Sequence, residues 1–151
     1  VLPHLGSGGL VSGAIEIASY LKSKGGVSLV LSSGGYREKD LNRTNCYLEF
    51  LPVDSKNPFI IIKNINKIVD IAKKYRINII HARSRAPAWS AYLASKKLKI
   101  PFITTFHGTY GVENYLKKEY NKVMIKGEAT IAISNFIKNH IKQEYKRKEK
   151  N

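Results

Sequence analysis

Four short loops in this sequence carry the glycines and side chains best suited to binding a ligand. They lie at residues 6–9, 82–87 and 107–110 and at Ser134. Each follows an apolar stretch of the length expected for a buried strand. Ligands of open parallel sheets bind outside the carboxyl ends of the strands, so the sequence predicts that these loops meet at one site.

The loop Gly6-Ser7-Gly8-Gly9 suits a phosphate group. Glycines allow close approach of the backbone, and the free N–H groups at the start of a helix favour an anion. A tight turn without a ligand is the alternative. The dinucleotide-binding fingerprint is not met, because Val11 stands where its third glycine belongs and the next strand ends in Ser32-Ser33 without an acid. The phosphate loop of nucleotide hydrolases is excluded too, since no Gly-Lys-Ser/Thr follows.

His107 and the arginines of the 82–87 loop are the side chains that could act on a bound substrate. A histidine at a strand end can donate to a sugar hydroxyl or a phosphate oxygen, and Gly108 leaves room for one. Arg83 and Arg85 could grip phosphate in bidentate fashion. The alternatives are that His107 has a purely structural role and that the two arginines are ordinary surface residues. No His, Cys or acidic residues have metal-ligand spacing, and no Ser-His-Asp arrangement is suggested.

Strands alternating with helices surround these loops, which predicts an α/β fold with a Rossmann-like parallel sheet and helices on both faces. Asn57-Pro58 is a strong helix start. Strands are predicted over residues 2–5, 27–31, 47–53, 77–81, 102–106 and 130–133. Helices are predicted from 11 to about 24, from 57 to beyond 72, over 87–98 and 114–126, and after Ser134 as a cap.

Composition narrows the class of protein. A chain of 151 residues with 43% hydrophobic content is one folded domain. Its single cysteine, Cys46, fits a reducing compartment, and its longest apolar run is far shorter than a membrane span. The formal charge of +15 attracts anionic membranes, nucleic acids or phosphorylated substrates. A/T-rich codons, which favour lysine, isoleucine and asparagine, are an equally good explanation of the basicity.

Four segments in fixed order resemble a known family. They are residues 5–9 (LGSGG), 81–89 (HARSRAPAW), 104–110 (TTFHGTY) and 131–134 (IAIS). Together they resemble the N-terminal, acceptor-side domain of bacterial family 4 glycosyltransferases with the GT-B fold, in particular the subgroup that builds lipopolysaccharide core or capsule.

The resemblance implies transfer of a sugar from a nucleotide-diphosphate donor to a cell-envelope glycan or lipid acceptor, with retention at the anomeric carbon. No cofactor and no metal are implied. Gly8 and Gly9 would contact the donor diphosphate, and His107 the transferred sugar. The acceptor side would be lined by Arg83, Ser84, Arg85, Tyr110 and Asn114.

The chain departs from the family in two respects. The C-terminal donor-binding domain is absent, and the first strand is short. We therefore expect residues 1–145 to form the domain, residues 146–151 to form a basic tail, and the chain to be inactive alone. It would be a fragment, a degraded gene product or a subunit of a split hexosyltransferase whose partner chain holds the donor domain.

Two other functions compete with transfer. One is a non-catalytic domain that recruits a partner or a membrane. The other, nucleic-acid binding, is disfavoured because no RNA-binding signature accompanies the basic tail. We expect a cytoplasmic protein that can rest on the anionic inner face of the cytoplasmic membrane. One candidate face is Lys117, Lys118 and Lys122 beside Tyr115 and Tyr120, and another is Lys142, Lys146 and Arg147.

Overall fold

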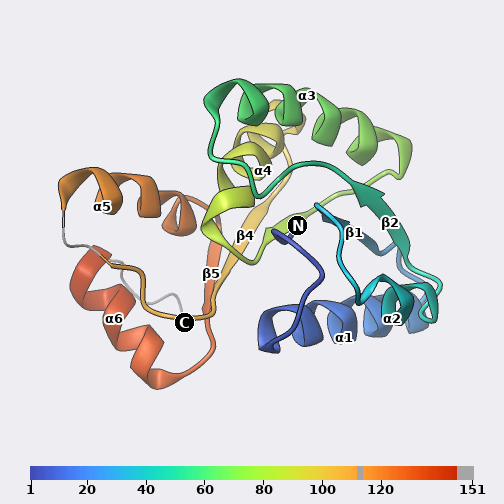
Figure 1. The fold of residues 1–151 in the computed structure, drawn as a ribbon, viewed down its shortest axis with the longest axis horizontal. Coiled ribbons are helices and arrows are strands. Elements are labelled where there is room, and N and C mark those ends of the chain that lie inside the picture. Colours follow the sequence, from blue (N-terminus) through green and yellow to red (C-terminus); the bar gives the residue numbers. More distant parts are fainter. Residues whose placement is uncertain (112–113, 146–151) are drawn as a thin grey trace.

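The computed structural model describes residues 1–111 and 114–145 (Figure 1). Its strands are β1 (Leu29–Ser32), β2 (Tyr47–Phe50), β3 (Ile80–Ala82), β4 (Phe102–Phe106) and β5 (Ala129–Ala132). Its helices are α1 (Gly9–Ser23), α2 (Glu38–Asn42), α3 (Pro58–Lys74), α4 (Arg85–Leu98), α5 (Tyr115–Asn121), the 3-10 helix η1 (Lys122–Ile125) and α6 (Asn135–Tyr145). The predicted basic tail, 146–151, lies outside the described residues.

The strands form two parallel sheets, β1 with β2 and β3 with β4 and β5. Residues 1–5 connect them. The N–H of Leu2 donates to the C=O of Leu31 at 3.0 Å, and on the opposite side the N–H of Arg83 donates to the C=O of Val1 at 3.0 Å. This segment takes the place of a central strand, as Figure 1 shows by the position of the N-terminus.

The strand predicted over residues 2–5 is not a regular one. The segment pairs on both sides, but Pro3 has no N–H to donate. Three other predictions also need correction. The helix expected from 87 begins at Arg85, the one expected over 114–126 tightens into η1 after Asn121, and α2 was not foreseen.

Helices cover both faces of the sheets, as predicted. Neighbouring residues of a strand point to opposite faces, and in β1 Val30 and Leu31 belong to different core clusters. Val30 packs with Val11, Ala14 and Ala18 of α1. The cluster around Leu31 includes buried residues of α3 and α4. Figure 1 shows α1 and α2 on one side and α3 and α4 on the other. The predicted α/β fold class is therefore confirmed.

Two helices begin at the residues that the sequence predicted as helix caps. The Asn57 side chain accepts from the N–H of Phe59 at 2.9 Å, with Pro58 in the first turn of α3. The Ser134 hydroxyl accepts from the N–H of Ile137 at 3.3 Å and caps α6. Within the described residues, none of the helices combines the length and hydropathy required to cross a membrane.

Candidate functional site

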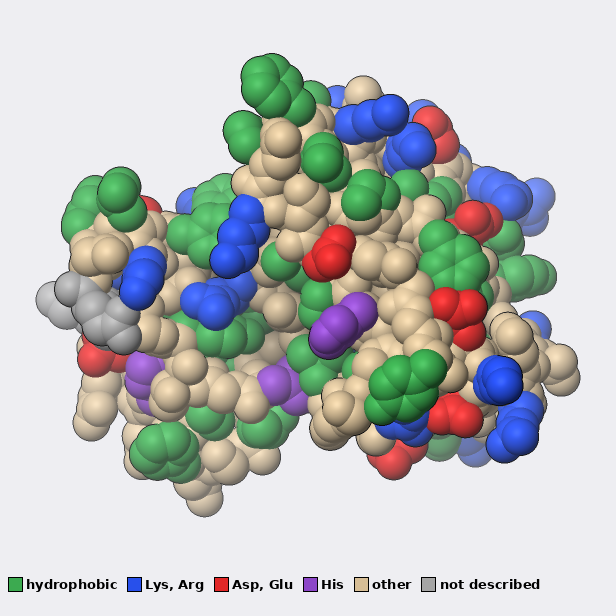
Figure 2. Space-filling view, viewed as in Figure 1, with side chains coloured by type: hydrophobic (Ala, Val, Ile, Leu, Met, Phe, Trp, Pro, Cys, Tyr) green, Lys and Arg blue, Asp and Glu red, His purple; other side chains and the backbone are tan. Residues whose placement is uncertain are grey.

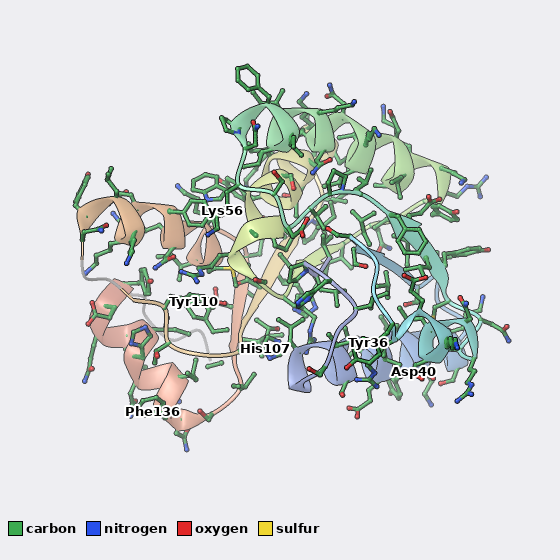
Figure 3. All side chains as sticks on the ribbon, in the orientation of Figure 1. Tyr36, Asp40, Lys56, His107, Tyr110 and Phe136 are labelled. Carbon is green, nitrogen blue, oxygen red and sulfur yellow. The ribbon has the colours of Figure 1, made fainter. Side chains whose placement is uncertain are left out.

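All strands run in the same direction, so the loops that follow them gather at one edge. Residues 6–9 follow the central segment, 83–84 follow β3 and 107–111 follow β4. Figure 3 shows His107, Tyr110 and Tyr36 on the same face of the molecule. The carboxyl edge is therefore the candidate site, as the rule for open parallel sheets predicts.

The glycine loop presents bare backbone. Gly8 has a φ of +104°, in the region that favours glycine, and Gly9 is the first residue of α1. No described atom lies within 4 Å of a Cβ built on either residue. The first N–H groups of a helix have no partner within the helix. The loop thus offers open space next to backbone donors, as an anion such as a diphosphate requires.

Arg83 lies beneath α1 and not in the open cleft. The residue is only 7% exposed, and its Nε donates to the C=O of Leu10 at 3.2 Å. A Cβ at Gly13 would lie 2.7 Å from Arg83 Nη2, so the glycine makes room for the guanidinium. In this structure Arg83 holds the first turn of α1 and with it the glycine loop. Its contact with an acceptor stays a prediction.

Arg85 and Tyr110 are brought together at the other side of the site. The Arg85 guanidinium lies over the Tyr110 ring, 4.4 Å from its centre, and Nη1 donates to Asn121 Oδ1 at 3.0 Å. Asn121 is buried and its Nδ2 donates to the C=O of Gly111 at 3.0 Å. Burial raises the pKa of Tyr110 to about 12, so the phenol is neutral and can donate a hydrogen bond.

Ser84 and Asn114 stand at helix starts. Ser84 precedes α4, and its side chain makes no capping hydrogen bond there. The Asn114 side chain accepts from the N–H of Lys117 at 2.8 Å and caps α5. Asn114 is therefore engaged in the fold, while the Ser84 hydroxyl is not used by the helix that it precedes.

His107 carries a half-buried imidazole directly after Phe106. Its Nε2 is buried without a hydrogen-bond partner among the described residues. Burial, and then the charge of Arg83, hold the pKa of His107 below its ordinary value of 6.5. The imidazole is consequently neutral at pH 7, with one N–H to donate and one lone pair. A Cβ at Gly108 would meet no described atom within 4 Å, which leaves room for a ligand.

His81, at the same edge, is engaged in contacts within the fold. Its Nε2 lies 2.7 Å from Thr105 Oγ1, and the Val1 amino group donates to its C=O at 2.6 Å. Burial, and then the charges of the Val1 amino group, Arg83 and His107, lower the pKa of His81 to about 3. Burial is therefore the main cause that keeps His81 and His107 neutral, and the charge of Arg83 adds to it.

The described residues contain no group of three or more His, Cys, Asp or Glu that could hold a metal ion. Arg83 lies against the first turn of α1, and the N-terminus of that helix adds partial positive charge beside the glycine loop. The arrangement therefore suits an anionic ligand.

The loop after β1 was not predicted from the sequence as part of the site. Tyr36 is 70% exposed there, yet the loop is firmly tied: the N–H of Arg37 donates to the C=O of Leu5 at 3.1 Å, and Arg37 Nη1 donates to Ser12 Oγ at 2.8 Å. Gly35 approaches Leu5 so closely that a Cβ would lie 2.3 Å from its oxygen. The signal was the Ser-Ser-Gly-Gly run, a second glycine turn at a strand end. No sequence pattern predicted a role for Asn121 at the site.

Comparison with known proteins gives a consistent picture. Residues 7–151 match the model of Glycosyltransferase Family 4. A glycosyltransferase from Rickettsia africae has 44% sequence identity and a TM-score of 0.83, over 98% of this chain and 40% of that one. No curated protein sequence matches.

Two more distant structures share the fold. Anabaena Alr3699/HepE, in complex with UDP and glucose, has 18% identity and a TM-score of 0.73, over 95% of this chain and 40% of that one. MurG of Acinetobacter baumannii has 17% identity and a TM-score of 0.65, over 87% of this chain and 40% of that one. This chain thus spans about 40% of the length of these solved proteins.

Proposed function

This chain belongs to glycosyltransferase family 4, and we propose that it is the N-terminal, acceptor-side domain of a retaining hexosyltransferase. The domain has the α/β architecture of GT-B glycosyltransferases. The proposed reaction moves a sugar from a nucleotide-diphosphate donor to a hydroxyl of a cell-envelope glycan or lipid, of the lipopolysaccharide-core or capsule type. The observation that carries the proposal is the pairing of an open glycine loop with a neutral His107 across Arg83.

The donor diphosphate would bind at Gly8 and Gly9. Its negative charge would lie against the N-terminus of α1, which is 15 residues long and whose first N–H groups have no side-chain cap at Gly8. Arg83 supports this contact through Leu10, since it fixes the turn that carries those groups. Positive charge at the diphosphate thus comes from protein groups, so we propose that the reaction needs neither a cofactor nor a metal.

His107 would contact the transferred sugar. Because its pKa is lowered, the imidazole is neutral and can donate one hydrogen bond to a sugar hydroxyl. Its unpartnered Nε2 supports this role, since a buried polar atom without a partner is costly unless a ligand satisfies it. The acceptor would approach from the side of Ser84, Arg85, Tyr110 and Asn114, where Arg85 and Tyr110 already lie together.

Catalysis would require a second domain. Because the chain corresponds to about 40% of the Rickettsia africae enzyme, we propose that these residues are inactive alone and that catalysis requires a donor-binding domain. Reconstitution tests this. The chain alone should show no transfer from UDP- or GDP-sugars, and addition of the remaining part of the Rickettsia africae enzyme as a separate polypeptide should restore turnover. His107→Ala should abolish it, whereas His4→Ala, at another histidine of this edge, should not. Turnover by the chain alone would refute the proposal.

A membrane-recruiting role has its own support and would act together with transfer or without it. Tyr115 is 75% exposed and Leu116 is 78% exposed at the start of α5, and Figure 2 shows basic side chains near apolar ones on this face. Two lysines of the predicted face are neutralised within the fold, since Lys118 pairs with Glu144 at 3.3 Å and Lys122 pairs with Glu119. The apolar pair would therefore act together with basic side chains outside these two ion pairs.

Vesicle sedimentation tests this role. We expect salt-sensitive pelleting with anionic vesicles, because each basic residue near such a surface contributes about 1 kcal/mol. Leu116→Asp should weaken it, whereas Leu21→Asp, a matched change on exposed α1, should not. Equal pelleting with neutral vesicles would contradict electrostatic docking. We propose that the protein is cytoplasmic and binds the inner face of the membrane in this way.

A further inference from the structure

Arg85 is surrounded by polar side chains on the acceptor side of the candidate site. It is half-buried at the first position of α4, with Nη1 bonded to Asn121 and the guanidinium over the Tyr110 ring. In the described part of the chain no carboxylate pairs with it, and no hydrogen bond uses its Nε or Nη2. Glu144, nearby on α6, pairs with Lys118 at 3.3 Å instead. Arg85 therefore keeps a positive charge and donors that the fold does not use.

Two buried tyrosine hydroxyls near this guanidinium also have no partner. The hydroxyls of Tyr120 and Tyr145 make no hydrogen bond with any residue that the structure describes, and Tyr145 is only 9% exposed. Asn121 approaches the Tyr145 hydroxyl without the geometry of a hydrogen bond. Burial raises the pKa of both phenols, against the charge of Arg85, so both are neutral and can donate. Buried polar atoms of this kind indicate a bound water, ion or ligand.

The rings that carry these hydroxyls are held by the fold itself. Tyr110 and Tyr145 both pack against Phe106, with ring centres 4.9 Å and 6.0 Å from its own. Trp89 Nε1 donates to the C=O of Tyr120 at 3.1 Å. The cluster thus joins α4, the loop after β4, α5 and α6, and its donors are in place before a ligand binds.

We propose that Arg85, Tyr120 and Tyr145 bind a phosphate group carried by the acceptor, so that the acceptor is a phosphorylated sugar. The inference rests on the proposed transfer reaction and names the chemistry of its acceptor. A phosphate monoester has three acceptor oxygens, and these three side chains bring donors from three helices, whereas a carboxylate has two oxygens. The N-terminus of α4 adds partial positive charge, since Ser84 makes no side-chain cap there.

The position of the cluster suits an acceptor. Tyr110 and His107 lie on one loop, three residues apart, so their backbones are separated by at most about 10 Å, and Figure 3 shows both on the same face. A sugar whose phosphate lies at Arg85 would therefore reach the transferred sugar at His107. The donor diphosphate would lie at Gly8, at the N-terminus of a different helix. Two anions would thus bind at separate helix starts.

NMR titrations of the ¹⁵N-labelled chain test the proposal. Glucose-6-phosphate should shift the indole N–H of Trp89, the only tryptophan, and the Nε of Arg85 with one saturable affinity. Inorganic phosphate and glucuronic acid should bind at least tenfold more weakly, and glucose should not bind. Equal binding of either anion, or no saturable shift, would overturn the inference. Shifts at Gly8 and Gly9 alone would also overturn it, because the phosphate would then occupy the donor loop, and the proposed function would stand.

Variants that remove single hydroxyls separate binding from folding. Tyr120→Phe and Tyr145→Phe should each weaken glucose-6-phosphate at least threefold without lowering the melting temperature, since a buried hydroxyl without a partner does not stabilise the fold. Arg85→Lys, which keeps the charge but not the two parallel donors, should weaken it at least tenfold. Tyr92→Phe, at a half-buried tyrosine of α4 that packs on Phe102, is the matched control and should bind normally. Unchanged affinity in both hydroxyl variants would refute the site.

Discussion

The two sides of the carboxyl edge hold their loops in different ways. The glycine side, residues 6–9 and 33–37, is fixed by backbone hydrogen bonds and close approach, as between Arg37 and Leu5, and it presents bare backbone. The side-chain side, residues 83–85 and 107–111, is fixed by side chains such as Arg85 and Asn121. Backbone donors recognise an anion of any identity, whereas side chains discriminate between substrates. In the proposed site, a general diphosphate contact would thus be separate from a specific sugar and acceptor contact.

Acid should destabilise the junction of the two sides, because it holds an imidazole that the fold keeps neutral. Burial is the main cause that lowers the pKa of His81 from 6.5 to about 3. Below about pH 6.5 the unfolded chain binds a proton at this imidazole that the folded chain does not, so stability should fall between pH 6.5 and pH 3. A tenfold change in proton affinity corresponds to about 1.4 kcal/mol, so the loss of stability should reach several kcal/mol.

Urea unfolding at a series of pH values measures this loss. His81→Gln removes this titration, so the variant should lose less stability than the unchanged chain below about pH 6.5. A stability independent of pH between about 6.5 and 4 would contradict the buried, neutral imidazole.

One added methyl group on the glycine side should lower the free energy of unfolding more than the side-chain substitutions on the other side. Gly35 has a φ of +149°, and its Cβ would lie 2.3 Å from the oxygen of Leu5. Strain and overpacking each cost about 1–3 kcal/mol, so Gly35→Ala should cost about 4 kcal/mol in unfolding free energy. Gly25→Ala is the matched control, since its φ of +79° is also positive but its Cβ would meet no described atom. It should cost about 1–2 kcal/mol, and equal losses would refute the close approach.

Arg83→Met should uncouple the two sides with a smaller loss of unfolding free energy than Gly35→Ala. It removes the hydrogen bond to Leu10 and the charge that, after burial, lowers the pKa of His107. Loss of a buried hydrogen-bonding partner costs about 1–3 kcal/mol. The pKa of His107, followed by NMR, should rise toward 6.5, whereas Arg43→Met on the exposed surface should leave it unchanged. An unaltered His107 titration in Arg83→Met would show that the two groups are not coupled.

Arg85→Met should loosen the side-chain side alone, and its effect should be the smallest. The variant loses the hydrogen bond to Asn121 and the contact with the Tyr110 ring, together worth about 1–2 kcal/mol. Amide exchange should accelerate around residues 110–111 and stay constant in α1. Faster exchange in α1 would mean that the two sides are not independently fixed.

The sequence predicted the fold class because alternating strands and helices leave few arrangements, and caps such as Asn57 and Ser134 mark the helix starts directly. It did not predict α2, because five residues show no helical period. The central segment became irregular through Pro3, a residue whose effect depends on having strands on both sides.

The site was predictable in position but less so in detail. Strand ends located His107 and the glycine loop, because parallel strands share one edge. The sequence could not tell which arginine of His-Ala-Arg-Ser-Arg is covered, since the burial of Arg83 depends on where α1 crosses it and on the space left by Gly13. The loop at residues 33–37 and Asn121 were missed because their contacts are with residues distant in the sequence.

An NMR titration of the ¹⁵N-labelled chain with UDP-glucose and GDP-mannose tests the central claim most directly. If the donor binds between the two sides, the amides of Gly8 and Gly9 and the ring of His107 should shift together and saturate with one affinity. Gly8→Ala should weaken that affinity at least tenfold, while Gly25→Ala leaves it unchanged. Saturable shifts confined to other residues, or no shifts at millimolar nucleotide sugar, would contradict the account.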